Sequence, residues 1–285
     1  MSMKKMFSYV TICLFGIIVF ALNSNYVLAL HNYTNYYGVE MTTDEYATLL
    51  NLGFNNDEIH YMSQDTFDAN KDLDATLLAS ETKYYKTVYP VYGNSYTVEV
   101  TENEYFNQNE VLPLDIQNTE YKTIVSTISA NGNKYRYKIS VAWKKMPSIR
   151  KYDIIGIGHV DDIHIYNSIV YFAYHYTTST SEYDSSLNYG GNTTEYGATK
   201  IYKLPDTMTG LSSTLYYDVE KDTGAGTLTS LSMCGDYSHA TSNSVTSTMA
   251  ANHSIGYGGI GLYSSIINLY DAVQCTYASV NNISW

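Results

Sequence analysis

The chain has 285 residues, of which 28 are acidic and 16 are basic, and its formal net charge at pH 7 is −12. A surface this negative repels phosphate groups, so no nucleic-acid partner is expected. The 32 tyrosines point to a mainly β protein, because aromatic residues are enriched in strands.

The first 29 residues have the order of a secretory signal peptide. Lys4 and Lys5 are followed by an apolar run, a polar stretch and then Val27-Leu28-Ala29. An uncleaved membrane anchor is the alternative, but the apolar run is shorter than the roughly 20 residues that a spanning helix needs. We therefore predict cleavage after Ala29 and a secreted, extracellular protein without a transmembrane helix. The mature chain then has 14 basic and 28 acidic residues, a net charge of −14.

Three consecutive helix-start signals follow. Thr42 with Glu45 and Asn55 with Glu58 form capping-box pairs, and Ser63 repeats the pattern in part. They predict short helices in three places: Thr43–Asn51, Asn56–Met62 and Gln64–Lys71. Helices this short are not stable alone in water, so they must pack on one another or on the rest of the chain.

The predicted fold class is α+β and mainly β. Residues 30–82 form a lead-in and an acidic three-helix unit, and residues 83–285 form an antiparallel β-sandwich-like domain, because short alternating segments recur between turns. A sub-boundary is possible near residues 147–152. A further capping pair, Thr101 with Glu104, predicts one short helix inside the β region. The apolar segment 168–176 is predicted to be a central strand, buried on both faces.

The clearest hairpin surrounds Asn131-Gly132, the preferred dipeptide of a type I′ turn. This turn would pair Ile128 with Tyr135 and Ile124 with Ile139. One face of the second strand is then apolar, and the opposite face is basic.

Basic residues gather on and after this hairpin. The candidate binding residues are Lys134, Arg136, Lys138, Lys144, Lys145, Arg150 and Lys151. They could form a docking face for an anionic partner, such as a wall polymer, an acidic lipid or an acidic protein. Alternatively, the acidic helices fold back onto the hairpin, or it is an ordinary solvated strand face. We expect the helices to dock there.

Two further residue groups could carry chemistry. Asp162 and His164 share one face of a predicted strand, and a hairpin could bring His175 close, which would suit zinc or copper. Solvent-facing histidines are the alternative. The mature cysteines, Cys234 and Cys275, could form one disulfide in an oxidising compartment or remain two buried thiols.

No hydrolase signature of the G-x-S-x-G or H-E-x-x-H kind is present, and no cofactor is expected. The serine- and threonine-rich stretch Ser242–Ser265 alternates with apolar residues and could rearrange into a membrane-inserting hairpin. Three functions therefore remain. The first is a secreted, non-catalytic binding or structural module for a glycan, a wall polymer or a protein, since tyrosines give rigid contact area. The others are a pore-forming, toxin-like protein and a hydrolase without a recognisable motif.

Two longer phrases, LLNLGFNNDEIHYM and YKISVAWKKMPSIRKYDIIGI, resemble a group of uncharacterised exported proteins of Firmicutes. The resemblance covers most of the mature chain. It implies export from a Gram-positive cell and the two-part layout, and it implies no activity.

Overall fold

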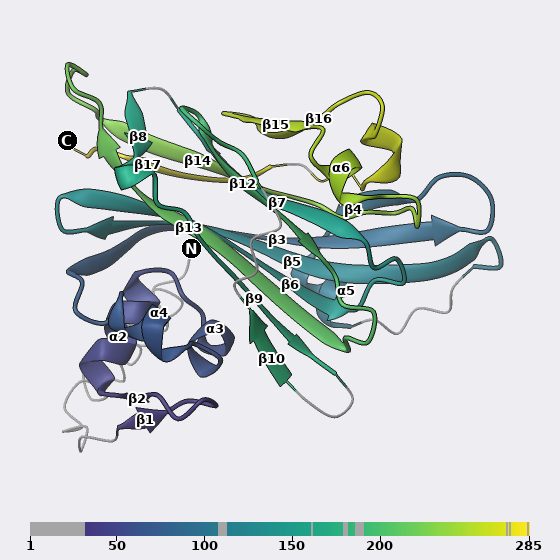
Figure 1. Ribbon diagram of the computed structural model, residues 1–285, viewed down its shortest axis with the longest axis horizontal. Coiled ribbons are helices and arrows are strands. Elements are labelled where there is room, and N and C mark those ends of the chain that lie inside the picture. The colour runs from purple at the N-terminus through teal and green to yellow at the C-terminus, as the bar shows by residue number, and fades with distance from the viewer. Residues whose placement is uncertain are drawn as a thin grey trace, which may run out of the picture.

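Two antiparallel sheets pack face to face, and three short helices lie against one of them (Figure 1). The computed structural model describes residues 32–107, 113–160, 162–178, 182–185, 191–271, 273, 275–283 and 285. The predicted signal peptide, residues 1–29, lies outside the described residues. The fold class predicted from the sequence is confirmed: the molecule is mostly β, with antiparallel sheets and a few helices.

The helices begin at the residues that the capping signals indicate. The described helices are α2 (Thr43–Asn51), α3 (Asn56–His60), α4 (Gln64–Asp68), α5 (Glu102–Phe106) and α6 (Ser247–Ala250), with 3-10 turns η1 (Tyr166–Ser168) and η2 (Ile267–Leu269). Thr42 and Asn55 each complete a reciprocal capping box, and Ser63 and Thr101 each accept one backbone N–H. Helices α3 and α4 end earlier than predicted, at His60 and Asp68.

The capping box at Thr42 gives a first prediction. Its hydroxyl accepts the N–H of Glu45 at 3.2 Å, and the Glu45 carboxylate accepts the Thr42 N–H at 2.7 Å. Thr42→Ala removes the hydroxyl, so we expect the free energy of unfolding to fall by about 1 kcal/mol. Thr42→Ser keeps the hydroxyl and should change it little. Urea denaturation of the three proteins measures this, and an equal loss in both variants would contradict the assigned cap.

The large sheet has the strand order β10-β9-β13-β6-β5-β3-β4, and β8 pairs with the end of β13. Its strands are β3 (Ala75–Pro90), β4 (Tyr96–Val100), β5 (Ile116–Asn131), β6 (Lys134–Lys145), β8 (Ile163–Ile165), β9 (Tyr171–Thr177), β10 (Glu182–Ser185) and β13 (Gly210–Lys221). Strand β3 begins at Ala75, so strand structure starts before the predicted change of pattern at Lys83.

The small sheet has the order β11-β12-β7-β14-β17. Its strands are β7 (Tyr152–His159), β11 (Thr193–Thr194), β12 (Gly197–Lys203), β14 (Ser230–Ser238) and β17 (Thr276–Asn281). Two small hairpins complete the fold: β1 (Tyr33–Thr34) with β2 (Glu40–Met41), and β15 (His253–Gly256) with β16 (Gly259–Leu262). The predicted sub-boundary near 147–152 lies where the chain passes from the last strand residue of β6, in the large sheet, to β7 in the small one.

Strand β6 shows how the sequence pattern makes two buried faces. Tyr137, Ile139 and Val141 point into the core between the sheets, as the alternation predicts. The opposite face carries the basic residues and is also buried, because the helices cover it. A strand such as β6 can therefore be buried on both faces even though its sequence is not a continuous apolar run.

The hairpin of β5 and β6 is present, with a register that differs from the predicted one. Asn131 pairs with Lys134, and Ile128 pairs with Tyr137. The loop is therefore Gly132-Asn133, and Gly132 has a φ of +61°. Glycine at the first loop position is typical of a type II′ turn, which moves the register by two residues. A shift of two keeps every side chain on its predicted face.

The prediction of a doubly buried central strand at 168–176 is wrong. Strand β9 lies between β13 and the edge strand β10, and its residues alternate, with Phe172 and Tyr174 buried and Tyr171 40% exposed. The prediction failed because it counted the tyrosines of this segment as apolar residues. A tyrosine can expose its ring edge and hydroxyl to solvent.

The stretch Ser242–Ser265 forms helix α6 and the β15–β16 hairpin, which cover the outer face of the small sheet (Figure 1). Val245, Ala250 and Ile266 pack there on Ile154 and Ile201. The apolar positions that suggested a membrane-inserting hairpin thus form a small second core. Among the described residues, no helix is both long and apolar enough to cross a membrane.

Candidate binding cleft

The helical segment, residues 42–70, is held on the large sheet by a buried ion pair. The Lys138 ammonium on β6 lies 2.7 Å from the Glu58 carboxylate on α3, and the two side chains are 1% and 8% exposed. The same ammonium donates to the carbonyl of Gly53 at 3.0 Å, just before α3. The hydroxyls of Ser140 and Thr214 also donate to Glu58. One carboxylate therefore connects α3 to both β6 and β13.

A second buried cation makes a parallel connection. The Arg136 guanidinium donates to Asp218 on β13 through Nε and Nη2, at 2.7 and 3.2 Å, and also to Asn70 after α4. It lies 4.6 Å from the ring centre of Tyr216, to whose hydroxyl Asn70 donates at 3.2 Å. The expected docking of the helices on the basic hairpin is confirmed.

The predicted anion-docking face is wrong for Arg136 and Lys138. Both are buried, at 3% and 1% exposure, and both are paired with carboxylates of the same chain. The physical reason differs for the two cations: Glu58 of the acidic helical segment neutralises Lys138, and Asp218 of the neighbouring strand β13 neutralises Arg136. An outside anion would have to displace the helices to reach them.

The other candidate basic residues lie at the two ends of β6 and just before β7. Lys134 covers the ring of Tyr166 at 3.8 Å, and Lys144 donates to the carbonyls of Tyr105 and Phe106 at the end of α5. Lys145 is exposed at the end of β6. The remaining two follow in the passage to β7: Arg150 donates to the carbonyls of Pro147 and Asp206, and the carbonyl of Lys151 accepts from Leu204.

The predicted metal ligands are not brought together. His164 pairs with Glu220 on β13, whereas His175 pairs with Ser212 on the same strand. Eight residues of strand separate those positions, which corresponds to about 26 Å. Within the described ranges, no group of three or more histidine, cysteine, aspartate or glutamate side chains could hold a metal ion. Asp162 is exposed at a turn with a φ of +71°.

His164 instead makes a small surface cluster with acids. Its Nδ1 is 2.6 Å from Asp222, and its Nε2 is 3.0 Å from Glu220. Partial burial lowers the pKa of His164, but hydrogen bonds and charge from the two carboxylates outweigh it and raise the pKa above 6.5.

The cysteines meet. Cys234 on β14 and Cys275 just before β17 are joined by a disulfide, so the structure adopts the first of the two alternatives left open by the sequence.

Docking of the helical segment leaves a cleft of about 390 Å³ between α3–α4 and the β9–β13 part of the large sheet. Six of its fourteen lining residues are aromatic, counting His175, and its polar groups are mostly hydroxyls. The lining includes Phe54, Glu58, Tyr61, Asp65, Tyr171 and Tyr216. A volume of this size is within the range of small-ligand and side-chain pockets.

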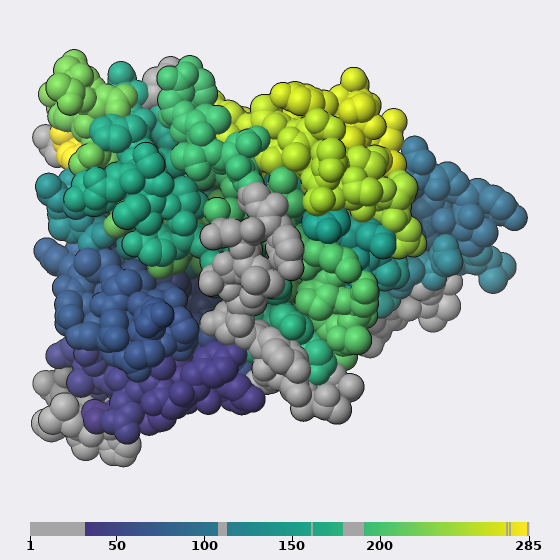
Figure 2. Space-filling view, viewed as in Figure 1, coloured from purple at the N-terminus to yellow at the C-terminus, as the bar shows by residue number. Residues whose placement is uncertain are grey.

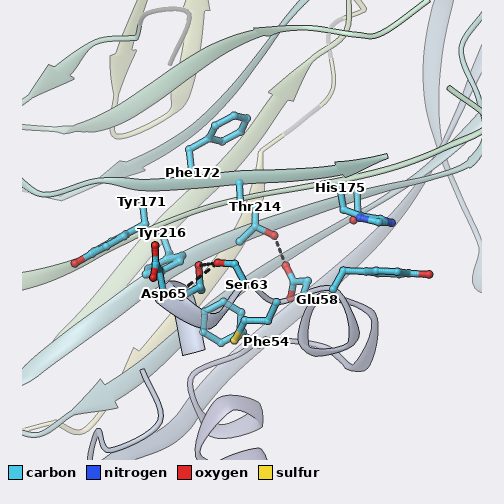
Figure 3. Close-up of a pocket in the computed structure, with 14 residues that line it drawn as sticks. Phe54, Glu58, Ser63, Asp65, Tyr171, Phe172, His175, Thr214 and Tyr216 are labelled. Carbon is cyan, nitrogen blue, oxygen red and sulfur yellow. Dashed lines mark hydrogen bonds between the residues drawn. The ribbon is translucent and has the colours of Figure 1, made fainter. Parts of the chain in front are cut away.

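Figure 3 shows how the lining residues lie. Tyr171 and Tyr216 stack at one end with ring centres 4.8 Å apart, and Phe54 meets Tyr216 edge-on at 5.4 Å. At the other end His175 stacks on Tyr61 at 3.6 Å. Phe172 points away from the cleft and into the core between the sheets. The cleft thus has two aromatic ends.

Glu58 is the buried acid of the cleft. Burial acts to raise its pKa, but the Lys138 ammonium and the hydrogen bonds from Lys138, Thr214 and the Asn55 N–H outweigh burial and lower the pKa below its ordinary value. Its oxygens are engaged by these partners. The carboxylate therefore holds the walls together and is not free to exchange protons with a bound molecule.

The two helices that form one wall of the cleft carry exposed acids. Asp57 on α3 and Asp65 and Asp68 on α4 are exposed. In space-filling view the N-terminal segment forms one corner of the molecule, and the β3–β4 end projects on the opposite side (Figure 2). Of these three exposed acids, Asp65 lines the cleft itself.

The sequence did not identify the residues of this cleft. Tyr171 and Tyr216 come from two strands paired 45 positions apart in the chain, and Phe54 comes from the segment before α3. The abundance of tyrosine was the one available signal, and it does not say which tyrosines meet.

No family model matches the chain, and no curated protein matches it. Among solved structures it is similar to the pilus backbone protein RrgB of Streptococcus pneumoniae, with a TM-score of 0.30 and 11% identity over 40% of this chain and 26% of that one. It is also similar to the collagen-binding domain of surface protein RspB of Erysipelothrix rhusiopathiae, with a TM-score of 0.30 and 7% identity over 58% of this chain and 63% of that one. The chain spans less than two thirds of either protein. Similarity this low supports no conclusion about function.

Proposed function

We propose that the protein is a secreted, non-catalytic binding module of a Gram-positive cell, and that its cleft binds a basic segment of another extracellular protein. The observation that carries this proposal is the cleft itself, with its aromatic ends, its hydroxyl groups and the exposed acid Asp65 in its lining. Export rests on the signal-peptide pattern of residues 1–29 and on the resemblance to exported Firmicutes proteins.

The electrostatics favour a cationic occupant. The exposed Asp65 lines the cleft, and Asp57 and Asp68 are exposed on the same two helices, whereas two of the basic residues that could have attracted an anion are buried in ion pairs. A lysine or arginine side chain entering the cleft gains charge attraction and a cation–π contact with a tyrosine ring. An anionic wall polymer would be repelled at the same place.

The chemistry favours binding over catalysis. The buried acid, Glu58, is committed to Lys138 and to two hydroxyl donors, and it stabilises the docked helices. Aromatic rings with few rotatable bonds lose little entropy on binding, so stacked tyrosines are efficient contact groups.

The proposal is tested with Tyr171→Ala. The purified protein is applied to an array of short synthetic peptides that vary in lysine, arginine and aromatic content, beside a neutral-glycan array and immobilised teichoic acid. We expect binding to basic peptides, weaker in high salt, and a 5- to 30-fold loss of affinity in Tyr171→Ala, since truncating an aromatic anchor costs about 1–2 kcal/mol.

Tyr92→Ala is the matched control. Tyr92 is 89% exposed in the connection between β3 and β4, which projects away from the helices (Figure 1). The Tyr92→Ala variant should bind basic peptides with the affinity of the wild type. Binding that is confined to teichoic acid or to glycans, or peptide binding reduced equally in both variants, would show the proposed partner or site to be wrong.

A further inference from the structure

A lysine and an aspartate face each other in the core of the sandwich, away from the cleft. Lys122 lies on β5 of the large sheet, and Asp271 lies in the segment that leads into β17 of the small sheet. Both side chains are 0% exposed, and the Lys122 ammonium contacts Oδ2 of Asp271. The pair joins positions 149 residues apart.

Two aromatic rings flank Lys122, and the buried Asp236 and His239 lie near enough to feel its charge. Its Nζ lies 4.8 Å from the ring centre of Trp143 and 5.5 Å from that of Tyr237, and both rings are buried. Keeping an ammonium and a carboxylate charged in such a place costs several kcal/mol per ion, which their attraction repays only in part. A neutral amide made from the same two groups would remove this cost.

The Asp271 carboxyl is held in one orientation. Its Oδ1 accepts the backbone N–H of His239 at 2.7 Å. Its Oδ2, on the side of Lys122, accepts the hydroxyls of Thr87 and Thr97 at 3.1 and 3.2 Å. The two oxygens therefore have different donors. A backbone N–H fixed on Oδ1 is placed where negative charge develops when a nucleophile adds to the carboxyl carbon.

We infer that Lys122 and Asp271 condense into an intramolecular isopeptide bond, an amide that links β5 to the segment leading into β17. The geometry supplies the two reacting groups in contact, an orienting donor on each oxygen and exclusion of water. Such preorganisation turns a reaction between two separate groups into an internal one.

The step balances within the pair. Burial alone would raise the pKa of Asp271, but the charges of Lys122 and His239 lower it, which favours the carboxylate. One proton passes from Nζ to Oδ2, and the amine lone pair then bonds to Cγ while charge collects on Oδ1. A second proton from nitrogen reaches Oδ2, the Cγ–Oδ2 bond breaks, and water leaves. One C–N bond forms, one C–O bond breaks, and nothing is oxidised or reduced.

Intact mass tests this directly. The secreted full chain is reduced, unfolded and weighed, with its N-terminus established by sequencing. We expect a mass lower than the sequence mass by one water, and a protease digest should contain a branched peptide that joins Lys122 to Asp271. An intact mass equal to the sequence mass would overturn the inference, as would a water loss confined to a single linear peptide.

Two variants sharpen the test. Lys122→Met has no nucleophile, so it should keep its full sequence mass. Asp271→Asn presents an amide that would release ammonia where the acid releases water, so the reacted variant should reach the same final mass as the wild type. Water loss that persists in Lys122→Met would contradict the inference. If either variant fails to fold, the wild-type mass and the branched peptide still decide it.

Discussion

Glu58→Ala is expected to reduce the free energy of unfolding by about 3–5 kcal/mol, the usual cost of removing one partner of a buried ion pair. The Lys138 ammonium would remain in a site that is 1% exposed and would lose its carboxylate at 2.7 Å. The same substitution removes the carboxylate that caps α3, because Glu58 accepts the Asn55 N–H at 2.8 Å. Urea denaturation measures the loss. Hydrogen exchange should show that residues 42–70 lose protection most.

A double variant separates the charge from the contact area. Lys138→Met alone leaves Glu58 buried and unpaired, so it should also be strongly destabilised. Replacing both residues with methionine removes both charges and keeps most of the volume, and such exchanges are often nearly neutral. We expect the double variant to be more stable than Lys138→Met alone. If the double variant is destabilised by as much as the sum of Glu58→Met and Lys138→Met, the pair has no coupled charge contribution.

Acid provides an independent check. The folded-state pKa of Glu58 lies below its ordinary value of 4.5, because Lys138 and the hydrogen bonds outweigh burial. The unfolded chain therefore takes up the proton first, so the stabilisation by Glu58 is complete above pH 4.5 and is lost as the pH falls through the lowered pKa. Glu58→Ala lacks this contribution. Its stability should fall less steeply than that of the wild type between about pH 5 and pH 3, as measured by urea denaturation at each pH.

Local signals predicted the helices well. Thr42, Asn55, Ser63 and Thr101 all act as caps in the structure, because a cap needs only a side chain and a backbone N–H a few residues away. The hairpin was also recognised, but its register depended on which residue of the loop takes a positive φ. Gly132 takes it alone in that loop, so the loop begins one residue later than the Asn-Gly rule predicts.

The ion-pair partners of β6 and the residues of the cleft could not be predicted from the sequence, because they depend on long-range pairing. The basic face of β6 was identified from alternation, but its partners Glu58 and Asp218 lie about 80 positions away on either side. The charge pattern suggested that the acidic helices could neutralise this basic face. It did not indicate which acid pairs with which cation. The cleft is still harder to predict, since Tyr171 and Tyr216 meet only because β9 pairs with β13.

Removing the disulfide is the second large effect that we expect. Cys234 and Cys275 are 41 positions apart, and closing a loop of that size stabilises a protein by about 3–4 kcal/mol on the chain-entropy model. The closed loop contains α6 and the β15–β16 hairpin, which pack as a small second core on the outer face of the small sheet. Reduction should therefore lower the urea midpoint and expose this region to protease before the large sheet.

Reductant and substitution must be compared, because Cys234 is fully buried and Cys234→Ala also creates a cavity. The loss on reduction of the wild type measures the crosslink alone. The additional loss in the reduced Cys234→Ala/Cys275→Ala variant measures packing of the sulfur atoms. Alkylation of the unfolded, unreduced protein distinguishes the two alternatives that the sequence left open. If both thiols react, and if reductant leaves the urea midpoint unchanged, the two cysteines are buried free thiols, and β14 is tied to β17 by strand pairing and packing alone.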